Sequence, residues 1–239
     1  MEEKFKEKNI LIVGASSGIG HNLAKHLLSE GANLITASRK KPEDIDAPHI
    51  ELDVLDFDAK ELQNQLPDAL HGLAYCPGSI NLKPFTRLDE NDFLNDFKIN
   101  ALGAAKIAQA CMIPLKKAKG AGIIFFSTVA VQTGMGFHAS IASAKGAVEG
   151  LTRSLAAELV NSKIRVNAIA PSLTDTPLAA NLLSSDEKRE ASAKRHPLGT
   201  VGQPQDMAKA ASYLLSEDSS WITGQVLKID GGLSSLRNL

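Results

Sequence analysis

Short runs of branched apolar residues alternate with amphipathic stretches along the whole chain. A short run such as residues 9–13, which is apolar after Asn9 and is followed directly by glycine, is typical of a buried strand. Apolar residues that recur every three or four positions, as Ile19, Leu23 and Leu27 do before Gly31, predict a helix with a glycine at its end. The two patterns predict strands at residues 9–13, 33–37, 49–53, 70–76, 122–127, 164–170 and 225–229, and later helices at residues 58–66, 89–117, 139–160 and 204–215.

This alternation of strands and helices predicts the fold class. A strand, a covering helix and a second parallel strand form a right-handed unit, and a series of such units gives an open parallel sheet with helices on both faces. We therefore expect one doubly wound, Rossmann-type α/β domain over residues 1–239. About ten residues separate the second and third strands, near the lower limit for a parallel crossover, so we expect a loop there. The long helix at residues 89–117 is expected to be interrupted at Pro114.

Composition and charge exclude several classes of protein. With 239 residues, of which 44% are hydrophobic and 22% charged, the chain has the size and composition of one large globular domain and not of a coiled coil or a disordered protein. A net charge of -1 provides no field that would attract nucleic acid or an anionic membrane. The longest uncharged stretch, residues 121–144, is interrupted by polar residues and is not expected to span a membrane.

The first residues and the cysteines add two further expectations. Residues 1–8 lack the apolar segment of a signal peptide, so we expect a cytoplasmic protein. Cys76 and Cys111 are too few for a disulfide framework, and no cysteine or histidine cluster has the spacing of a zinc site. We therefore expect no metal centre.

A glycine-rich turn joins the first predicted strand to the first predicted helix. Glycine allows a sharp turn, lets backbone N–H groups approach a pyrophosphate and lets the helix pack closely on the strand. The positive end of the helix dipole then faces the phosphates. In this strand-turn-helix context we predict a dinucleotide site, whose residues are Gly14, Ser16, Ser17, Gly18, Ile19 and Gly20.

The end of the second predicted strand indicates which dinucleotide binds. An NAD site carries an acid here that holds the ribose 2′-hydroxyl. This chain has Ser38 and Arg39, which can bind a 2′-phosphate through charge-assisted hydrogen bonds, whereas an acid would repel it. We therefore predict NADP(H) as the cofactor; the alternative is that Arg39 and Lys40 form a solvated surface turn.

Together with motifs later in the chain, these features resemble the short-chain dehydrogenase/reductase family over nearly the whole length. The glycine motif is similar, as are the C-terminal motifs at residues 222–225 and 230–232. The resemblance implies that Asn100 organises the active site and that Lys145 binds the nicotinamide ribose. It also implies further cofactor-binding residues after the third, fourth and sixth strands, namely Asp53, Val54, Cys76, Pro77, Gly78, Pro171, Ser172, Thr174 and Thr176.

The chain departs from the family at the residue that donates the proton. Most members carry a Tyr four residues before the active-site Lys, and counting back from Lys145 leads to Ile141. The family Ser, thirteen residues before that Tyr, corresponds to Thr128, with Ser127 beside it. Thr128 can polarise a substrate oxygen but is a poor acid on its own, so the resemblance leaves the proton donor unassigned.

Two other side chains are candidates for this role. His138 lies seven residues before Lys145, two helical turns away, on roughly the same helix face. Enoyl-carrier reductases, a divergent branch of the family, resemble this arrangement with a Tyr at that spacing, and an imidazole can act as an acid near neutral pH. The alternative is that His138 only belongs to the loop that enters the helix. Tyr75, near the end of the fourth strand, is a second candidate, although an aromatic residue there is more typical of the core.

We therefore expect an NADP(H)-dependent oxidoreductase that transfers hydride to or from a small carbonyl, alcohol or enoyl substrate. Residues 172–200 are expected to form a mobile lid over the substrate. Family resemblance implies a homotetramer or dimer built on the two long helices and the last strand. We expect the contact between the helices to bury Ala104, Ala105, Ala147 and Ala156. The alternative function is that of a catalytically silent NADP(H)-binding regulatory or scaffold protein.

Overall fold

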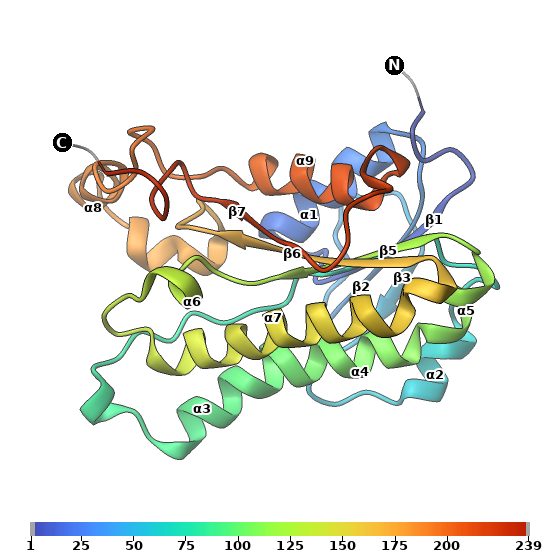
Figure 1. Cartoon of the computed structure of the whole chain (residues 1–239), viewed down its shortest axis with the longest axis horizontal. Coiled ribbons are helices and arrows are strands. Elements are labelled where there is room, and N and C mark those ends of the chain that lie inside the picture. The colour runs from blue at the N-terminus through green and yellow to red at the C-terminus, as the bar shows by residue number, and fades with distance from the viewer. Residues whose placement is uncertain (1–2, 238–239) are drawn as a thin grey trace.

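Seven parallel strands form the centre of the computed structural model, which describes residues 3–237 (Figure 1). Their order in the sheet is β3-β2-β1-β4-β5-β6-β7, so the chain reverses its direction of travel between β1 and β4. This topology confirms the doubly wound parallel sheet. The strands are β1 Asn9–Val13, β2 Asn33–Ser38, β3 His49–Glu51, β4 Gly72–Tyr75, β5 Ala121–Phe126, β6 Ile164–Pro171 and β7 Val226–Ile229.

Helices cover both faces of the sheet. In Figure 1, α1 (Gly18–Ser29) and α9 (Pro204–Leu215) lie on one face, and the long α7 (Ala139–Leu159) lies with α3 and α4 on the other. The remaining elements on this side or at the edges are α2 Ala59–Asn64, α3 Glu90–Phe97, α4 Gly103–Ala110, α5 Met112–Lys117, α6 Ala130–Thr133 and α8 Asp186–Ala193. No helix among the described residues is both long and apolar enough to cross a bilayer.

The core consists of two apolar layers, one on each face of the sheet. Along β1, Leu11 and Val13 belong to the layer beneath α4 and α7, whereas Ile10 and Ile12 belong to the layer beneath α1 and α9. Such alternation follows from the two-residue period of a strand. Because both faces of β1 are covered, its sequence is apolar at every position after Asn9, and these four residues are buried.

The region between β2 and β3 is a loop, as predicted, but the long helix differs from the prediction. A π-helical segment, Lys98–Leu102, separates α3 from α4, and α4 ends at Ala110. The expected break at Pro114 is wrong: the interruption falls at Cys111, and Pro114 lies in the first turn of α5. Proline is tolerated there because the first N–H groups of a helix have no acceptor within it.

Two expectations depend partly on residues outside the described part of the chain. The predicted single domain covers residues 1–239, whereas residues 1, 2, 238 and 239 are not described. The first two also belong to the N-terminal segment that we expect to lack a signal peptide. Within residues 3–237, the one seven-stranded sheet accounts for every named strand.

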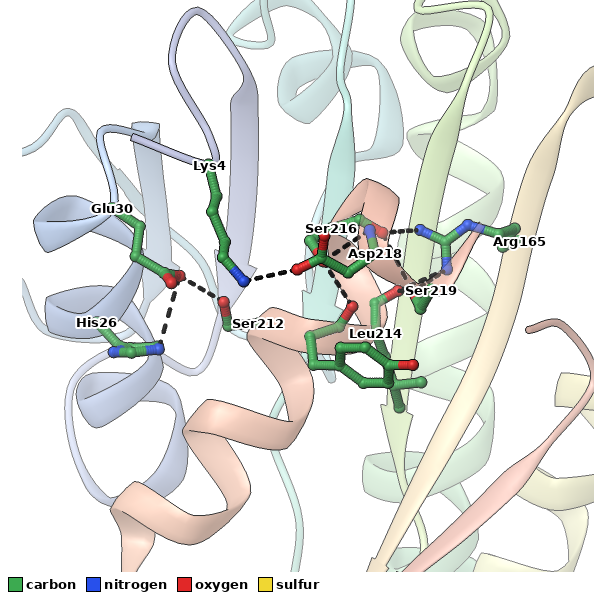
Figure 2. Close-up of polar contacts among 10 residues, drawn as sticks. Lys4, His26, Glu30, Arg165, Ser212, Leu214, Ser216, Asp218 and Ser219 are labelled. Atoms are coloured by element: carbon green, nitrogen blue, oxygen red, sulfur yellow. Dashed lines mark hydrogen bonds and ion pairs between the residues drawn. The ribbon is translucent and has the colours of Figure 1, made fainter. Parts of the chain in front are cut away.

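Arg165, at the start of β6, fixes the C-terminal end of α9 (Figure 2). Its guanidinium donates hydrogen bonds to the carbonyl oxygens of Leu214, at 2.7 Å, and Ser216, at 2.9 Å, and to the Ser219 hydroxyl, at 2.8 Å. The last carbonyls of a helix lack partners within it, and a cation there also offsets the helix dipole. Arg165 therefore caps α9 from the sheet.

The same end of the molecule joins elements that are far apart in sequence. The Ser212 hydroxyl of α9 donates to the carboxylate of Glu30, just after α1, at 2.5 Å. Near the N-terminus, Lys4 forms an ion pair with Asp218 at 2.6 Å (Figure 2). These contacts hold the N-terminal region against the last third of the chain, at the end of the sheet opposite to α6 and α8.

We predict that Arg165→Ala lowers the free energy of unfolding by about 2–3 kcal/mol, because it leaves buried helix carbonyls without a charged donor. Chemical denaturation monitored by circular dichroism measures this change. Lys209→Ala is the matched control, since it removes an exposed cation from α9 itself, and it should change the stability by less than about 0.5 kcal/mol. Equal effects of the two substitutions would show that Arg165 does not cap the helix.

Candidate active site

A pocket of about 340 Å³ opens at the carboxyl edge of the sheet, next to the switch point between β1 and β4. Ligands of doubly wound sheets bind at this place because neighbouring loops diverge there. The loops after four adjacent strands contribute most of the wall. The pocket brings together most of the predicted cofactor residues, namely Gly14, Ser16, Ser17, Gly18, Ile19, Gly20, Ser38, Arg39, Asp53, Val54, Cys76, Pro77, Gly78 and Thr176.

The glycines of the first loop are required by its geometry. Gly14 and Gly18 have φ angles of +84° and +58°, a backbone conformation that residues with a side chain rarely adopt. A Cβ at Gly20 would collide with the carbonyl oxygen of Gly14. Ser17, the N-cap of α1, makes no side-chain hydrogen bond to the helix. The N–H groups of the first turn therefore face the pocket without a side-chain cap, an arrangement suited to an anionic ligand.

Ser38 and Arg39 differ in their freedom to contact a ligand. Ser38 is buried, and its hydroxyl donates to the carbonyl of Lys40 at 2.8 Å. Arg39 is exposed beside the pocket and forms no ion pair with any residue in the described part of the chain. On the next loop, Asp53 accepts a hydrogen bond from the N–H of Leu55 at 3.0 Å. Arg39 is therefore the cation at this end of the pocket.

Tyr75 ends β4 beneath the π-helical segment. Its hydroxyl donates to the carbonyl of Ile99 at 2.5 Å, and the side chain is buried. Burial raises the pKa of the phenol above its usual value. A Cβ at Gly103 would collide with this hydroxyl, so the glycine provides the space for the ring. Tyr75 is a core residue that supports the helix, and it does not face the pocket as a proton donor.

Asn100 lies in the π-helical segment with its side chain buried. The amide nitrogen donates to the Ser79 hydroxyl at 2.9 Å and to the carbonyl of Asp96 at 2.7 Å. Its amide oxygen has no hydrogen-bond partner among the described residues. This oxygen would lie 3.3 Å from a Cβ at Gly78, so it faces the loop that lines the pocket. A buried acceptor without a donor is rare, and it fits a site that a ligand completes.

Lys145 converges on the same glycine. The ammonium is buried in α7 and donates to the carbonyl of Phe126, at the end of β5, at 2.6 Å. It would lie 3.5 Å from a Cβ at Gly78. Burial lowers the pKa of Lys145 to about 8, against the opposing influence of Cys76 and Asp96. Burial also raises the pKa of the Cys76 thiol, to about 12.

The two hydroxyls after β5 point in different directions. Ser127 is buried, and its hydroxyl donates to the carboxylate of Glu149 on α7 at 2.9 Å. Thr128 is partly exposed, and its hydroxyl oxygen accepts a hydrogen bond from the N–H of Ala130 at 3.3 Å. Thr128 is therefore the hydroxyl available to a ligand at this position.

Ile141 and His138 lie at the N-terminal end of α7. Ile141 is buried, so the position that the resemblance assigns to a Tyr holds an apolar side chain. His138 is the N-cap residue of α7 and is partly exposed, with its Nδ1 atom 2.7 Å from the carbonyl oxygen of Gly136. A carbonyl oxygen can only accept a hydrogen bond, so Nδ1 carries the hydrogen, and Nε2 has no hydrogen-bond partner within residues 3–237.

Neither the pocket wall nor its glycine loop includes Asn100, Lys145, Thr128 or His138. In the segment from the end of β6 onward, Thr176 lines the pocket, whereas Pro171, Ser172 and Thr174 do not. Thr174 is buried and donates to the carbonyl of Ser172 at 3.0 Å.

Sequence reasoning missed His196, which fixes this loop. Its Nε2 lies 2.8 Å from the Ser172 hydroxyl, and its Nδ1 lies 2.8 Å from the carbonyl of Ser192. The carbonyl of Ser192 can only accept, so Nδ1 carries the hydrogen. When the ring is neutral, Nε2 therefore accepts a hydrogen bond from the Ser172 hydroxyl. Because the partners are 24 residues apart, no sequence spacing indicates this contact.

The predicted lid, residues 172–200, contains a 3₁₀ helix at Pro177–Leu183 and the helix α8. Arg189 of α8 donates to the carboxylate of Asp175 through its two terminal guanidinium nitrogens, at 2.6 and 3.3 Å. In Figure 1, α8 lies beyond the carboxyl edge of the sheet. The loops that line the pocket leave the sheet at this same edge. Its movement over a substrate remains a prediction.

Two of the alanines expected at a subunit contact are buried inside the chain. Ala104 and Ala156 are 0% and 5% exposed because they face the core layer under α4 and α7. The expectation that they contact a partner subunit is therefore wrong. Ala105 and Ala147 are partly exposed and remain candidates.

Comparison with known proteins gives a consistent result. A family model described as enoyl-(acyl carrier protein) reductase matches residues 14–234. L-xylulose reductase from Bos taurus is 30% identical to this chain over 247 residues, which cover 97% of this chain and 98% of that protein. A 3-oxoacyl-(acyl-carrier-protein) reductase from Thermotoga maritima is 31% identical over 247 residues, covering 96% and 99%.

Solved structures share the whole fold. Aldohexose dehydrogenase from Thermoplasma acidophilum has a TM-score of 0.92 and 26% identity, covering 100% of this chain and 98% of that one. A gluconate 5-dehydrogenase from Burkholderia cenocepacia, solved with NADP and tartrate, has a TM-score of 0.90 and 26% identity, covering 99% and 98%.

A parallel sheet with a glycine-lined pocket at its switch point defines the class of dinucleotide-binding α/β proteins. Within that class, the family match over residues 14–234 decides the assignment, and the chain belongs to the short-chain dehydrogenase/reductase family.

We predict that Gly103→Ala and Tyr75→Phe are energetically coupled. Gly103→Ala brings a methyl group against the Tyr75 hydroxyl and should destabilise the fold by about 1–3 kcal/mol. Tyr75→Phe removes one hydrogen bond and should cost about 1 kcal/mol. In the double variant the methyl group of the new alanine occupies the space that the hydroxyl has left. The destabilisation of the double variant, measured by denaturation, should therefore be smaller than the sum of the two single effects by about 1 kcal/mol.

Gly150→Ala is the control for this cycle, because a Cβ at Gly150 in α7 meets nothing within 4 Å. It should raise the free energy of unfolding by about 0.5–1 kcal/mol. Strict additivity of Gly103→Ala and Tyr75→Phe would refute the steric account of Gly103.

Proposed function

We propose that this protein is an NADP(H)-dependent oxidoreductase that transfers hydride between the cofactor and a small carbonyl, alcohol or enoyl substrate. The observation that carries the proposal is the convergence of Lys145, the unpaired oxygen of Asn100 and the glycine-lined pocket on Gly78. A site built only to bind a nucleotide needs the glycine loop, but it does not need a buried ammonium beside an open acceptor.

The pocket fits a dinucleotide. The uncapped first turn of α1 suits a pyrophosphate, and Arg39 suits a 2′-phosphate at the end of β2. Asp53 and Val54 line the same pocket and would contact the adenine ring, and Lys145 would hold the nicotinamide ribose. The gluconate 5-dehydrogenase of known structure carries NADP, in support of this choice.

The residues of this chain would orient the substrate and exclude water. A bound nicotinamide supplies or accepts a hydride. Thr128 would donate a hydrogen bond to the substrate oxygen as negative charge develops on that oxygen. Asn100, through its hydrogen bonds to Ser79 and Asp96, would hold the π-helical segment in place beside Lys145. Residues 172–200, tied to the sheet by Ser172 and His196, would close over the substrate.

A second candidate function is supported by Ile141. This side chain is apolar, buried and without a proton to give, which favours a catalytically silent NADP(H)-binding protein with a regulatory or scaffold role. The two functions share the cofactor pocket and differ in turnover. In either case, we propose self-association through α4 and α7, with Ala105 and Ala147 at the contact, and no interaction with nucleic acid or membranes.

Cofactor choice is tested by Arg39→Ala. We expect the parent protein to bind NADPH at least about tenfold more tightly than NADH, a difference of about 1.4 kcal/mol. Arg39→Ala should remove most of this preference and leave the affinity for NADH unchanged, because only NADPH carries the 2′-phosphate. Quenching of nucleotide fluorescence measures both constants. Lys41→Ala, an exposed cation two residues further along, is the control, and equal parent affinities for the two cofactors would overturn the assignment.

The missing phenol is tested at Ile141. We expect Ile141→Tyr to raise kcat for carbonyl reduction by at least tenfold, since general acid catalysis is worth roughly 10²–10⁴-fold. Ile141→Phe is the matched control, because it adds the ring without the hydroxyl and should not raise kcat. NADPH oxidation over a panel of carbonyl and enoyl substrates, with circular dichroism to verify folding, measures the effect.

The same assay separates the competing accounts. If His138 is the acid, His138→Ala abolishes turnover while the affinity for NADPH stays constant. Full activity in His138→Ala eliminates that account. If neither the parent nor Ile141→Tyr turns over any substrate while both bind NADPH, the catalytically silent function is the correct one.

A further inference from the structure

A buried carboxylate lies beside the candidate active site. Asp96, on α3, is 2% exposed. One carboxylate oxygen accepts a hydrogen bond from the Ser79 hydroxyl at 2.6 Å, and the other accepts one from the Ser140 hydroxyl of α7 at 2.5 Å. Ser79 in turn accepts from the amide of Asn100. Asp96 is thus the common acceptor at the junction of α3, α7 and the loop after β4.

No cation within residues 3–237 forms an ion pair with this carboxylate. Burying an ionised carboxylate is expensive, and two neutral hydroxyls compensate only part of the lost hydration. An acidic residue at such a place is therefore unfavourable for the fold alone. Buried charges without a paired counter-ion are found most often at functional sites, where their electric field acts on a neighbouring group.

The charge that Asp96 can balance is that of Lys145. This ammonium is buried on the neighbouring helix and uses one of its three donors on the carbonyl of Phe126. It would lie 3.5 Å from a Cβ at Gly78, so it lies directly behind this residue of the pocket wall. The other two donors have no hydrogen-bond partner among the described side chains and carbonyls. A proton is therefore available on the side of the pocket.

The remaining charged and titratable neighbours do not replace Asp96. Cys76, from the loop after β4, has a raised thiol pKa and is neutral near pH 7. Glu149, one turn after Lys145 on α7, is engaged by Ser127 and by Arg153 at 3.7 Å. On the outer side of Asp96, Asp92 and Lys83 pair with each other at 2.6 Å.

We propose that the Lys145 ammonium is the proton donor of the reaction in this chain, and that Asp96 is a positioning residue that keeps this ammonium charged inside the fold. The proposal rests on the proposed oxidoreductase function and assigns the role that Ile141 cannot fill. Ile141 lies one helical turn before Lys145 and has no proton to give. On that face of α7, Lys145 is the ionisable group nearest to the position of Ile141.

The proton balance of the step is complete. In the reductive direction, hydride from NADPH forms the new C–H bond, the π pair of the carbonyl moves to oxygen, and that oxygen takes a proton from Lys145 directly or through one water. Lys145 becomes a neutral amine and regains its proton from solvent, and NADP⁺ leaves. The reverse reaction begins with the neutral amine as the base.

The pH dependence follows from the sign of the charges. The pKa of about 8 means that Lys145 is largely protonated at pH 7, and the acid is lost as the pH rises past that value. The negative charge of Asp96 favours the ammonium, so its removal lowers the pKa of Lys145 further. Reduction should therefore fail at a lower pH in Asp96→Asn than in the parent.

Two measurements on the full chain test the proposal. The first is an NMR titration of protein labelled with ¹³C at lysine Cε, in which the signal absent from Lys145→Arg identifies Lys145. We expect its midpoint near pH 8 in the parent, at lower pH in Asp96→Asn, and unchanged in Glu90→Gln, which neutralises an exposed acid on the same helix. An unchanged midpoint in Asp96→Asn would overturn the role of Asp96.

The second measurement is the pH profile of NADPH oxidation with the best substrate of the panel. We expect the rate to fall at the NMR midpoint and to move with it in Asp96→Asn. Arginine keeps the positive charge but releases no proton near neutral pH, so Lys145→Arg should bind NADPH and lose turnover by at least about 100-fold. Ser143→Ala, at an exposed hydroxyl of α7, should leave the profile unchanged, whereas Ser140→Ala should move it.

The outcomes separate this proposal from the proposed function. Turnover that persists in Lys145→Arg, or above the NMR midpoint, would refute Lys145 as the donor and leave the oxidoreductase function in place. A parent that binds NADPH but reduces no substrate, while Asp96→Asn still moves the midpoint, would overturn the oxidoreductase function and confirm the charge coupling alone.

Discussion

The hydrogen bond from Lys145 to the carbonyl of Phe126 is the constraint around which the candidate active site is arranged. It joins the longest helix to the end of a central strand, and it does so with a buried charge. An ammonium in this position needs a carbonyl acceptor on one side and negative potential on another. The end of β5 supplies the first and Asp96 on α3 the second. The glycine at position 78 then leaves the third side open to the pocket.

The sequence predicts the parts of this arrangement that depend on local spacing. The apolar run of β1 indicates a strand that is covered on both faces, and the structure places its alternate residues in two core layers. The glycines between β1 and α1 predict a turn that only they can form, as the positive φ of Gly14 and Gly18 confirms. The identities of Asn100 and Lys145 were available only through the resemblance to a family, because neither residue has a local pattern that reveals a function.

Contacts between distant segments could not be predicted in this way. Asp96 and Ser140 are 44 residues apart, and a polar residue on an amphipathic helix is normally expected to face solvent. The Tyr75 hydroxyl of β4 occupies the space beside Gly103 of α4. His196, near the end of the predicted lid, contacts the hydroxyl of Ser172 at its start. The break at Cys111 was missed for a related reason. Proline was expected to interrupt the helix, but its effect depends on where the helical turn begins.

The closure of the sheet by α9 has a consequence for the order in which the chain folds. Leu23 and Leu27 of α1 belong to the same core layer as Met207 and Leu214 of α9, and Lys4 meets Asp218 across a separation of 214 residues. During synthesis, the apolar side chains of the first strands and α1 on this face therefore stay exposed to solvent until the last third of the chain has left the ribosome. Non-local contacts of this kind slow folding and leave apolar surface exposed meanwhile. The N-terminal half alone should thus expose apolar surface that the full chain buries under α9.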